Sequence, residues 1–338
     1  SPLYSLHGPH ESTLAALDEF HERVAKAESI IIAGGGPSGV ETAGQLATYF
    51  NRNNKNAGSV GQPDIKPADS EDRAPSSVAT TKRDSKFSIR PKSSPASPKQ
   101  DCKPKVITLI SGNERLLPRL PVNIGDAAET KLKKLGVHIL HDRRVLTSQE
   151  LPTSSGTKTR CVLNDTTSIA ADIYIAATGV YPNTAYLPTE LLDASGYINV
   201  DPQYLRVEGS VGDRVFAIGD CANYSKNYVL DVYEAVPILL HNLRNDLWEY
   251  ELRLQNPYGG QAIEREIEQL TDQVYTQNPT DTQLVPITRY GGVGIMFGWK
   301  LPSLVVHLMK GRDYRIGKAR MVANQGHNPY APDTYVYR

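Results

Sequence analysis

Cysteine is scarce in this sequence of 338 residues, and its three positions exclude several kinds of site. Cys102, Cys161 and Cys221 are widely separated and form no Cys-x-x-Cys pair. This spacing argues against a redox-active disulfide, a zinc knuckle and the disulfide framework of a small secreted domain. We therefore expect an intracellular protein, cytoplasmic or mitochondrial, without a bound metal.

Two further absences narrow the function. Lys and Arg together number 37, as do Asp and Glu, so the chain lacks the basic excess that is typical of nucleic-acid-binding proteins. No run of 18 or more apolar residues occurs, so no segment has the composition of a membrane-spanning helix. The chain begins at Ser1 without a signal-peptide pattern, which indicates a fragment or a processed protein.

One long stretch lacks the residues from which a core is built. Residues 51–104 are rich in Asn, Ser, Pro and Lys and contain almost no large apolar side chains. Such a segment cannot bury enough surface to offset its ordering entropy, so we interpret it as a disordered insertion. Its basic Ser/Pro steps are compatible with phosphorylation or weak docking, although a tolerated surface insertion is the simpler interpretation.

The clearest motif is a glycine turn between a predicted strand and a predicted helix. Ser29–Ala33 is a β-branched apolar run typical of a buried parallel strand, and apolar residues recur at helical spacing from Val40 to Phe50. Between them stands Gly-x-Gly-x-x-Gly, which in this setting predicts a loop that binds a dinucleotide pyrophosphate at a helix N-terminus. The cofactor-binding residues expected here are Gly34, Gly35, Gly36, Pro37, Ser38, Gly39 and Glu41.

The choice of nucleotide depends on the end of the next predicted strand, residues 105–110. NAD-binding domains place an acidic residue there, on the ribose hydroxyls, but this strand ends at Ser111. We expect Ser111 and Arg115 to face the adenosine ribose, which slightly favours NADPH. Binding of NADH stays an alternative, because Glu114 is close enough in sequence to reach the ribose hydroxyls. Glu41 allows two interpretations, charge stabilisation of the helix N-terminus or a contact near the nicotinamide.

A second group of motifs follows the dinucleotide loop. The run "ATG" ends at Thr178 and Gly179, and "VFAIGD" ends at Gly219 and Asp220. A buried strand that ends in Gly-Asp places a carboxylate where it can accept hydrogen bonds from the ribityl chain of a flavin. These four residues are therefore further candidate cofactor contacts.

Together with the closing "GWKLPSLVVHLMKGRDY", these motifs resemble the pyridine nucleotide-disulfide oxidoreductase-like flavoproteins. The resemblance is to the apoptosis-inducing-factor-like, ferroptosis-suppressor-type NAD(P)H:quinone oxidoreductases, and it covers most of the chain outside the insertion. It implies an α/β fold in which a Rossmann-like NAD(P) domain is inserted in an FAD domain. It also implies FAD and NAD(P)H as cofactors, and electron transfer through flavin to a quinone-like acceptor.

The resemblance also implies domain boundaries. Residues 1–28 would be a linker helix, 29–179 the NAD(P)-binding domain, 180–255 the C-terminal part of the FAD domain and 256–338 a C-terminal cap. This family begins with an FAD-type glycine loop, and none precedes Gly34. We therefore expect the N-terminal half of the FAD domain to be absent from this chain.

Within the second half, the pattern predicts a hairpin over 196–207, a buried strand over 214–220 and a helix over 229–250 that Pro237 should kink. The apolar-then-basic stretch Trp299–Arg312 fits peripheral membrane contact. It fits equally well a packed segment whose Lys310 and Arg312 are solvated.

Two other functions stay open at this stage. One is a non-catalytic nucleotide-sensing or interaction protein that retains the NAD(P) domain, and the other is a ferredoxin- or nitrite-reductase-type flavoprotein. No residue is identifiable as a general acid or base, and the sequence does not predict the oligomeric state.

Overall fold

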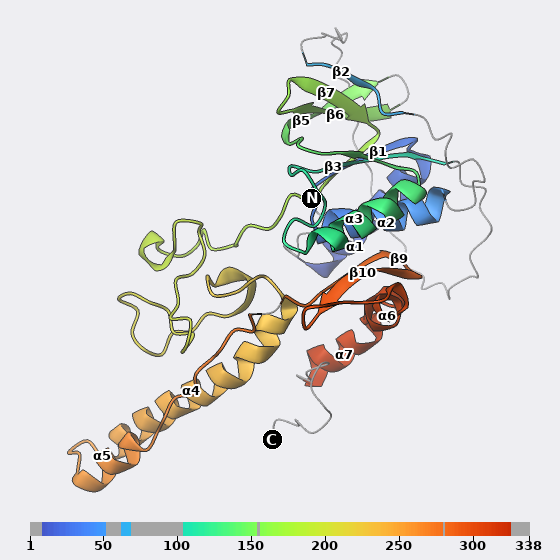
Figure 1. Ribbon diagram of the computed structural model, residues 1–338. Coiled ribbons are helices and arrows are strands. Elements are labelled where there is room, and N and C mark those ends of the chain that lie inside the picture. The colour runs from blue at the N-terminus through green and yellow to red at the C-terminus, as the bar shows by residue number, and fades with distance from the viewer. Residues whose placement is uncertain (1–8, 52–61, 69–103, 154–155, 280, 326–338) are drawn as a thin grey trace. The chain divides into compact units, whose positions relative to one another are not determined.

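The computed structural model describes residues 9–51, 62–68, 104–153, 156–279 and 281–325. Its internal contacts divide the chain into two compact units (Figure 1). Unit 1 comprises Ser1–Gly179 and Asp281–Gly317, and unit 2 comprises Val180–Thr280 and Lys318–Arg338. The region that the sequence placed in a C-terminal cap is therefore divided, because its residues 281–317 pack within the unit that carries the glycine loop and the others belong to unit 2. The domain boundaries themselves stay predictions.

A parallel sheet lies at the centre of unit 1, as its apolar strands predict, and the α/β class is confirmed. The strand order is β4-β3-β1-β8. The strands are β1 (Ser29–Ala33), β3 (Val106–Ile110), β4 (Val137–Leu140) and β8 (Ile173–Ala176). Ile30 and Ile32 belong to one buried cluster, whereas Ile31 belongs to another with Cys161 and Ile169. Both faces of β1 are thus covered, which explains its uninterrupted apolar composition.

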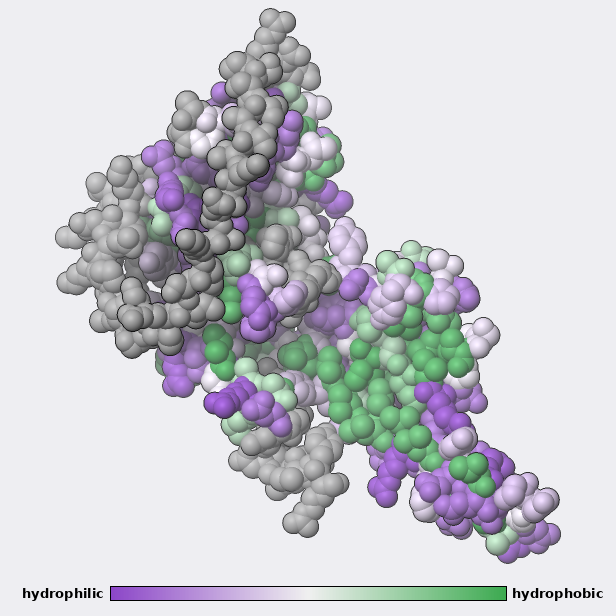
Figure 2. Space-filling model, turned by 180° about the vertical axis from the view of Figure 1, so that it is seen from behind, coloured by the Kyte–Doolittle hydropathy of each residue, from purple (hydrophilic) through white to green (hydrophobic). Residues whose placement is uncertain are grey.

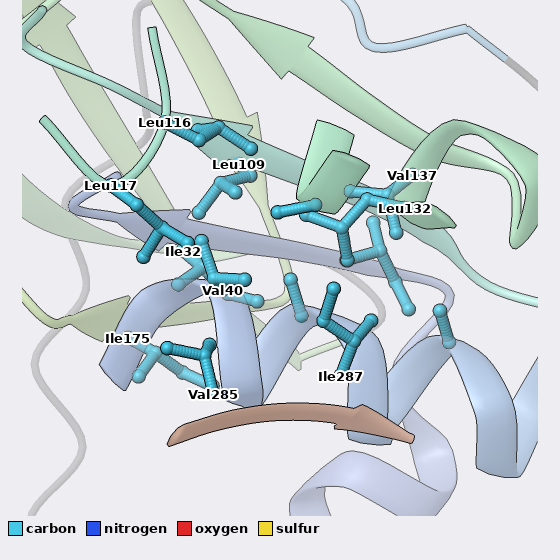
Figure 3. Close-up of a cluster of buried hydrophobic side chains, with 14 of the residues drawn as sticks. Ile32, Val40, Leu109, Leu116, Leu117, Leu132, Val137, Ile175, Val285 and Ile287 are labelled. Carbon is cyan, nitrogen blue, oxygen red and sulfur yellow. The ribbon is translucent and has the colours of Figure 1, made fainter. Parts of the chain in front are cut away.

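Three helices contribute to the larger of these clusters (Figure 3). They are α1 (His10–Lys26), α2 (Pro37–Asn51) and α3 (Val122–Lys134). Val40, Ala43 and Ala47 lie at helical spacing on α2, and all three are fully buried. The apolar period that predicted this helix is therefore the face that packs on the sheet.

An antiparallel sheet of order β2-β7-β6-β5 belongs to the same unit. It consists of β2 (Ile65–Pro67), β5 (Val145–Thr153), β6 (Gly156–Leu163) and β7 (Thr167–Ala171). In β2, Ile65 lies opposite Ile169 of β7. The prediction of disorder over 51–104 is therefore wrong for residues 62–68, because pairing with a neighbouring strand supplies order that composition does not reveal. Residues 52–61 and 69–103 of that segment lie outside the described residues.

The two ends of the insertion are tied together. The side-chain Nδ2 of Asn51 donates to the backbone oxygen of Lys105 at 3.1 Å, and its Oδ1 accepts from the backbone nitrogen of Lys105 at 2.9 Å. Both residues are buried. The long segment therefore begins and ends at a closed junction.

The C-terminal part of unit 1 completes its core. It contains β9 (Gln283–Thr288), β10 (Gly291–Met296), β11 (Trp299–Lys300), α6 (Ser303–Val306) and the π-helical turn η5 (His307–Gly311). Helix α7 (Ile316–Gln325) begins at the end of this part, and its residues from Lys318 onward belong to unit 2. Val285 and Ile287 of β9 are fully buried in the large cluster (Figure 3). A Cβ on Gly44 of α2 would lie 2.1 Å from the backbone oxygen of Ile287, so only glycine permits this approach.

Unit 2 has little regular structure before its long helix. Its elements are η3 (Thr189–Leu191), η4 (Gly219–Cys221), α4 (Val229–Gln255) and α5 (Gln261–Glu268). The predicted strand over 214–220 is wrong, because only an isolated bridge between Arg206 and Phe216 forms there. The predicted hairpin is reduced to one antiparallel bridge, between Val200 and Val207. Helix α4 continues through Pro237 and extends beyond its predicted end.

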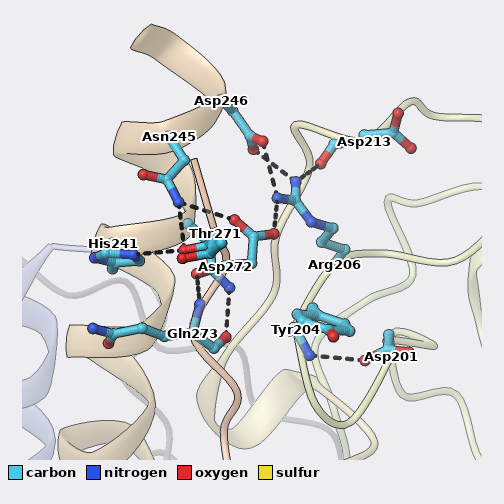
Figure 4. Close-up of polar contacts among 11 residues, drawn as sticks. Asp201, Tyr204, Arg206, Asp213, His241, Asn245, Asp246, Thr271, Asp272 and Gln273 are labelled. Atoms are coloured by element: carbon cyan, nitrogen blue, oxygen red, sulfur yellow. Dashed lines mark hydrogen bonds and ion pairs between the residues drawn. The ribbon is translucent and has the colours of Figure 1, made fainter. Parts of the chain in front are cut away.

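Side-chain contacts hold the irregular segments of unit 2 to α4 (Figure 4). The Arg206 guanidinium bonds to both carboxylate oxygens of Asp246 at 2.6 and 2.9 Å, and to Asp272 at 2.7 Å. Nε2 of His241 lies 3.0 Å from the backbone oxygen of Thr271, which gives this histidine a packing role. Three parts of the chain therefore meet at one ion-pair network.

Figure 2 shows apolar side chains gathered on the surface of unit 2. Large apolar residues of α4 that are exposed include Leu240, Leu247, Trp248 and Leu254. Exposed apolar surface of this kind is typical of a contact face. Among the described residues, no helix combines the length and the apolar composition that crossing a bilayer requires.

Candidate functional site

The glycine loop lies at the carboxyl edge of the parallel sheet of unit 1. The Gly34 nitrogen donates to the Ile110 oxygen at 2.8 Å, and the Ala177 nitrogen donates to the Ala33 oxygen at 2.7 Å. The ends of β1, β3 and β8 therefore meet at this loop. In open α/β sheets, ligands bind at this edge.

The three motif glycines differ in what surrounds them. A Cβ on Gly34 would lie 2.0 Å from the Ala177 oxygen, and one on Gly39 would lie 1.8 Å from the Gly34 oxygen. Gly34 also has a φ of 128°, which favours glycine. At Gly36, by contrast, a Cβ would meet nothing within 4 Å. Packing requires the outer two glycines, whereas the middle one leaves open space that a phosphate could use.

Helix α2 begins directly behind this open space. Pro37 is its first residue, a position at which the fixed φ of proline suits a helix start. Ser38 and Gly39 follow in the first turn, whose backbone N–H groups have no partner within the helix. These groups and the helix dipole favour an anion. The loop therefore fits a dinucleotide pyrophosphate, while the assignment of each residue from Gly34 to Gly39 stays a prediction.

Glu41 pairs with a residue that is remote in sequence. Its Oε1 lies 2.8 Å from Nζ of Lys310 in η5, and the same ammonium donates to the Leu284 oxygen at 3.1 Å. Burial raises the pKa of the Glu41 carboxyl, and the nearby Lys310 charge opposes this rise. The expectation that Lys310 is solvated is therefore wrong, because its charge neutralises a desolvated carboxylate at the start of α2.

Tyr314 extends this contact. Its hydroxyl accepts a hydrogen bond from Nε2 of Gln45 at 3.1 Å, and its ring lies 5.8 Å from Nζ of Lys310. Burial, with the charge of Glu41, raises the pKa of Tyr314 to about 12. The sequence analysis missed this group, because 269 positions separate Glu41 from Lys310 and no periodicity links them.

Ser111 lies beneath the glycine loop. It is fully buried, and a Cβ on Gly35 would come within 2.4 Å of its hydroxyl oxygen. That hydroxyl donates to the Asn113 oxygen at 3.0 Å. The serine therefore shapes the loop from below, and a direct contact with a ribose would require it to leave this position.

The Arg115 guanidinium is also engaged. It donates to the backbone oxygens of Leu120 at 2.7 Å and Pro118 at 2.6 Å. These bonds close the loop that follows β3. The roles of Ser111 and Arg115 at the ribose stay predictions, and these contacts do not favour them.

Thr178 and Gly179 follow β8 and are exposed. A Cβ on Gly34 would lie 3.2 Å from the Thr178 nitrogen, so this turn borders the glycine loop. Gly179 has a φ of 115°, and a Cβ there would meet open space. The structure therefore brings the "ATG" motif to the same edge as the dinucleotide loop.

Gly219 and Asp220 belong to unit 2 and form the start of η4. Gly219 has a φ of 80°, and its nitrogen donates to the Tyr224 hydroxyl at 3.1 Å. The Asp220 side chain is exposed, with no hydrogen bond or ion pair among the described residues. A free carboxylate acceptor on a glycine turn fits the ribityl hydroxyls of FAD.

The neighbours of this turn are ordinary structural groups. The Cys221 thiol lies 3.5 Å from the Ile218 oxygen, and burial raises its pKa. Nζ of Lys226 donates to the Asn278 oxygen at 3.0 Å. Neither contact indicates a nucleophile.

Known proteins are similar to this chain in sequence. A family model described as pyridine nucleotide-disulphide oxidoreductase matches residues 6–237. Oxidoreductase phnG of Penicillium herquei is 30% identical over 322 residues, 93% of this chain and 64% of that protein. Ferroptosis suppressor protein 1 of Homo sapiens is 29% identical over 215 residues, 62% of this chain and 51% of that protein. The type II NADH:quinone oxidoreductase of Haemophilus influenzae is 30% identical over 118 residues, 34% of this chain and 24% of that protein.

The chain thus spans less than two thirds of the length of each of these relatives. Proteins of the matched family bind FAD and NAD(P)H, in agreement with the two groups of residues described above. Because the family match covers more than half of its length, this chain belongs to the pyridine nucleotide-disulphide oxidoreductase family.

Proposed function

We propose that this protein is an FAD-dependent NAD(P)H oxidoreductase that passes electrons to a quinone-like acceptor. The proposal rests mainly on the open space at Gly36, which lies between Gly34 and Gly39, two positions where packing leaves no room for a Cβ. Quinone as the acceptor class is supported by the name of one relative, a type II NADH:quinone oxidoreductase. Because the chain spans only part of the length of its relatives, the proposed activity is assigned to the whole protein and not to the described residues alone.

The residues of unit 1 have a binding role in this proposal. Backbone N–H groups of Gly35, Gly36, Ser38 and Gly39 would hold the pyrophosphate of NAD(P)H. Glu41, neutralised by Lys310, lies one helical turn behind them and avoids repelling the phosphates.

In unit 2, the exposed Asp220 carboxylate would accept hydrogen bonds from the ribityl hydroxyls of FAD. The Thr178–Gly179 turn of unit 1 is proposed separately as a cofactor contact beside the glycine loop. When bound, FAD supplies the redox chemistry by accepting a hydride from the nicotinamide. The protein's own contribution is orientation, because no described residue is assigned as an acid or base.

We also propose that the protein meets its quinone acceptor at a membrane surface inside the cell, where quinones reside. Its support is that residues 297–308 of unit 1, a segment that also contains Lys300, include four exposed large apolar side chains. They are Phe297, Trp299, Leu304 and Leu308. An apolar surface bordered by basic residues favours binding to anionic lipid. Sedimentation of the chain with anionic vesicles, abolished by Trp299→Ser with Leu308→Ser, tests this part.

The nucleotide site is tested by Gly36→Ala. The added methyl would project into the space required for a phosphate, so we expect NADPH and NADH affinities to fall roughly tenfold or more by isothermal titration calorimetry. Gly317→Ala is the matched control, since a Cβ there also meets nothing within 4 Å. Both variants should keep the wild-type unfolding midpoint. Unchanged affinity in Gly36→Ala would refute this loop as the site.

Because the chain spans only part of its relatives, catalysis is tested with the chain supplied with the N-terminal FAD half of a relative, fused or in trans, together with FAD, NADPH and a soluble short-chain quinone. We expect NADPH oxidation that depends on both FAD and quinone and is lost in Asp220→Ala. Nucleotide binding without any oxidation would instead favour a non-catalytic nucleotide-sensing protein.

A further inference from the structure

The loop that follows β4 is joined to the loop that follows β3. The Arg143 nitrogen donates to the Ser111 oxygen at 3.0 Å, and the Asp142 nitrogen donates to the Asn113 oxygen at 3.3 Å. The two loops are therefore held side by side at the carboxyl edge of the parallel sheet. This register brings Arg144 to Gly112.

Arg144 lies directly against Gly112. A Cβ on Gly112 would come within 3.0 Å of both Cγ and Nε of Arg144, so the glycine leaves room for the arginine side chain. The Arg144 backbone is fixed as well. Its nitrogen donates to Oδ1 of Asn164 at 2.9 Å, and its oxygen accepts from the Asn164 nitrogen at 3.0 Å.

The Arg144 guanidinium is exposed and has no hydrogen bond or ion pair among the described residues. Its neighbours differ in this respect. Nε of Arg143 pairs with Asp165 at 2.6 Å, and Arg115 donates to two backbone oxygens. Of these three arginines, Arg144 alone can offer its donors to a ligand.

Gly112 is also next to the dinucleotide loop. The Leu117 nitrogen donates to the Gly35 oxygen at 2.8 Å, and Ser111 lies under Gly35. In dinucleotide-binding domains, the residues after the second strand meet the adenosine ribose, and an arginine there accommodates a 2′-phosphate. The planar guanidinium suits a phosphate because it donates two parallel hydrogen bonds.

We infer that Arg144 binds the 2′-phosphate of NADPH and makes this chain selective for the phosphorylated nucleotide. The inference rests on the proposed nucleotide site, and it identifies the residue that makes this site prefer NADPH to NADH. Two exposed carboxylates, Glu114 and Asp142, belong to the same two loops. A carboxylate there would favour NADH instead, because it would accept hydrogen bonds from the ribose hydroxyls and repel the 2′-phosphate.

The test compares Arg144→Gln with Arg143→Gln and Glu114→Gln in the full chain. Calorimetric titrations use NADPH, NADH and adenosine 2′,5′-bisphosphate. Loss of charge-assisted hydrogen bonds should weaken NADPH and the bisphosphate by roughly ten- to a hundredfold in Arg144→Gln and leave NADH nearly unchanged. The NADPH affinity of the wild type should also fall more steeply with salt than that of the variant. Arg143→Gln and Glu114→Gln should keep the wild-type ratio of NADPH to NADH affinity.

An equal loss for NADH and NADPH in Arg144→Gln, or no loss for either, would overturn the inference and leave the proposed function standing. The same holds if the Glu114 variant, and not the Arg144 variant, changes the ratio. A wild-type chain that binds neither nucleotide would instead refute the proposed nucleotide site, and the inference with it.

Discussion

Replacing Arg206 with methionine should strongly destabilise unit 2. The guanidinium makes three bonds of 2.6 to 2.9 Å to Asp246 and Asp272, and it also donates to the Asp213 oxygen. The side chains of Arg206, Asp246 and Asp272 are only 20%, 13% and 26% exposed. Methionine keeps much of the packing of the arginine but leaves two largely buried carboxylates without a cation.

The size of the effect follows from that burial. Removing one partner of a buried ion pair costs about 3–5 kcal/mol, which is a large share of the stability of a typical domain. With a urea dependence of roughly 1–3 kcal/mol per molar, the unfolding midpoint of unit 2 should fall by roughly 1–5 M. Arg206→Lys should recover only part of this loss, because one ammonium cannot form the same set of parallel hydrogen bonds.

The assay uses the position of the two tryptophans. Trp248 belongs to unit 2 and Trp299 to unit 1, so in a Trp299→Phe background the fluorescence reports on unit 2. The matched control is Arg253→Met. Arg253 also bridges two carboxylates, Glu249 at 2.9 Å and Glu264 at 3.1 Å, but on the surface. It should leave the midpoint nearly unchanged. Equal midpoint shifts for the two arginines would refute the reasoning from burial.

Two other predictions concern unit 1, observed through Trp299 in a Trp248→Phe background. Because burial raises the pKa of Glu41 above its ordinary 4.5, its contribution to stability is complete below the unfolded-state pKa and is lost as the pH rises through the folded-state pKa. Glu41→Gln should therefore reduce the loss of stability as the pH rises above the ordinary carboxyl pKa of 4.5, measured as urea midpoints, and parallel curves for both proteins would contradict this. Gly44→Ala should destabilise unit 1 by about 1–3 kcal/mol, because its methyl would overlap the Ile287 oxygen of β9. An unchanged urea midpoint in Gly44→Ala, compared with the Gly317→Ala control, would show that α2 and β9 can separate without cost.

Local patterns were sufficient to predict the centre of unit 1. The strand Ser29–Ala33 has the bounds expected from its β-branched run, and the glycine loop stands where a strand meets a helix. Such signals depend on neighbours in sequence, so no tertiary information is needed. The insertion shows the opposite case. Ile65–Pro67 forms a strand only because β7 offers an edge, which composition cannot indicate.

Unit 2 was harder to predict for a related reason. Its apolar residues between 180 and 228 occur in short runs that resemble strands, yet they form small buried clusters around isolated bridges. What holds these segments is the ion-pair network of Arg206, whose partners are 40 and 66 positions away. Specific side-chain contacts of this kind leave no periodic signal.

The same limit applies to the candidate site, where the contacts that shape the dinucleotide loop come from distant segments. Helix α2 begins at the glycine loop, while Glu41 pairs with Lys310 and Gly44 lies against Ile287. Arg144 lies against Gly112 because β4 is beside β3, although a whole helix separates these strands in sequence. Sequence spacing after β3 therefore predicts a ligand contact for Arg115, whose guanidinium instead bonds to backbone oxygens of its own loop. It does not identify Arg144, which the strand order brings to Gly112. In a parallel sheet, the ligand site is formed by loops that follow strands adjacent in the sheet and not always adjacent in sequence. The strand order must therefore be known before ligand selectivity can be assigned to a residue.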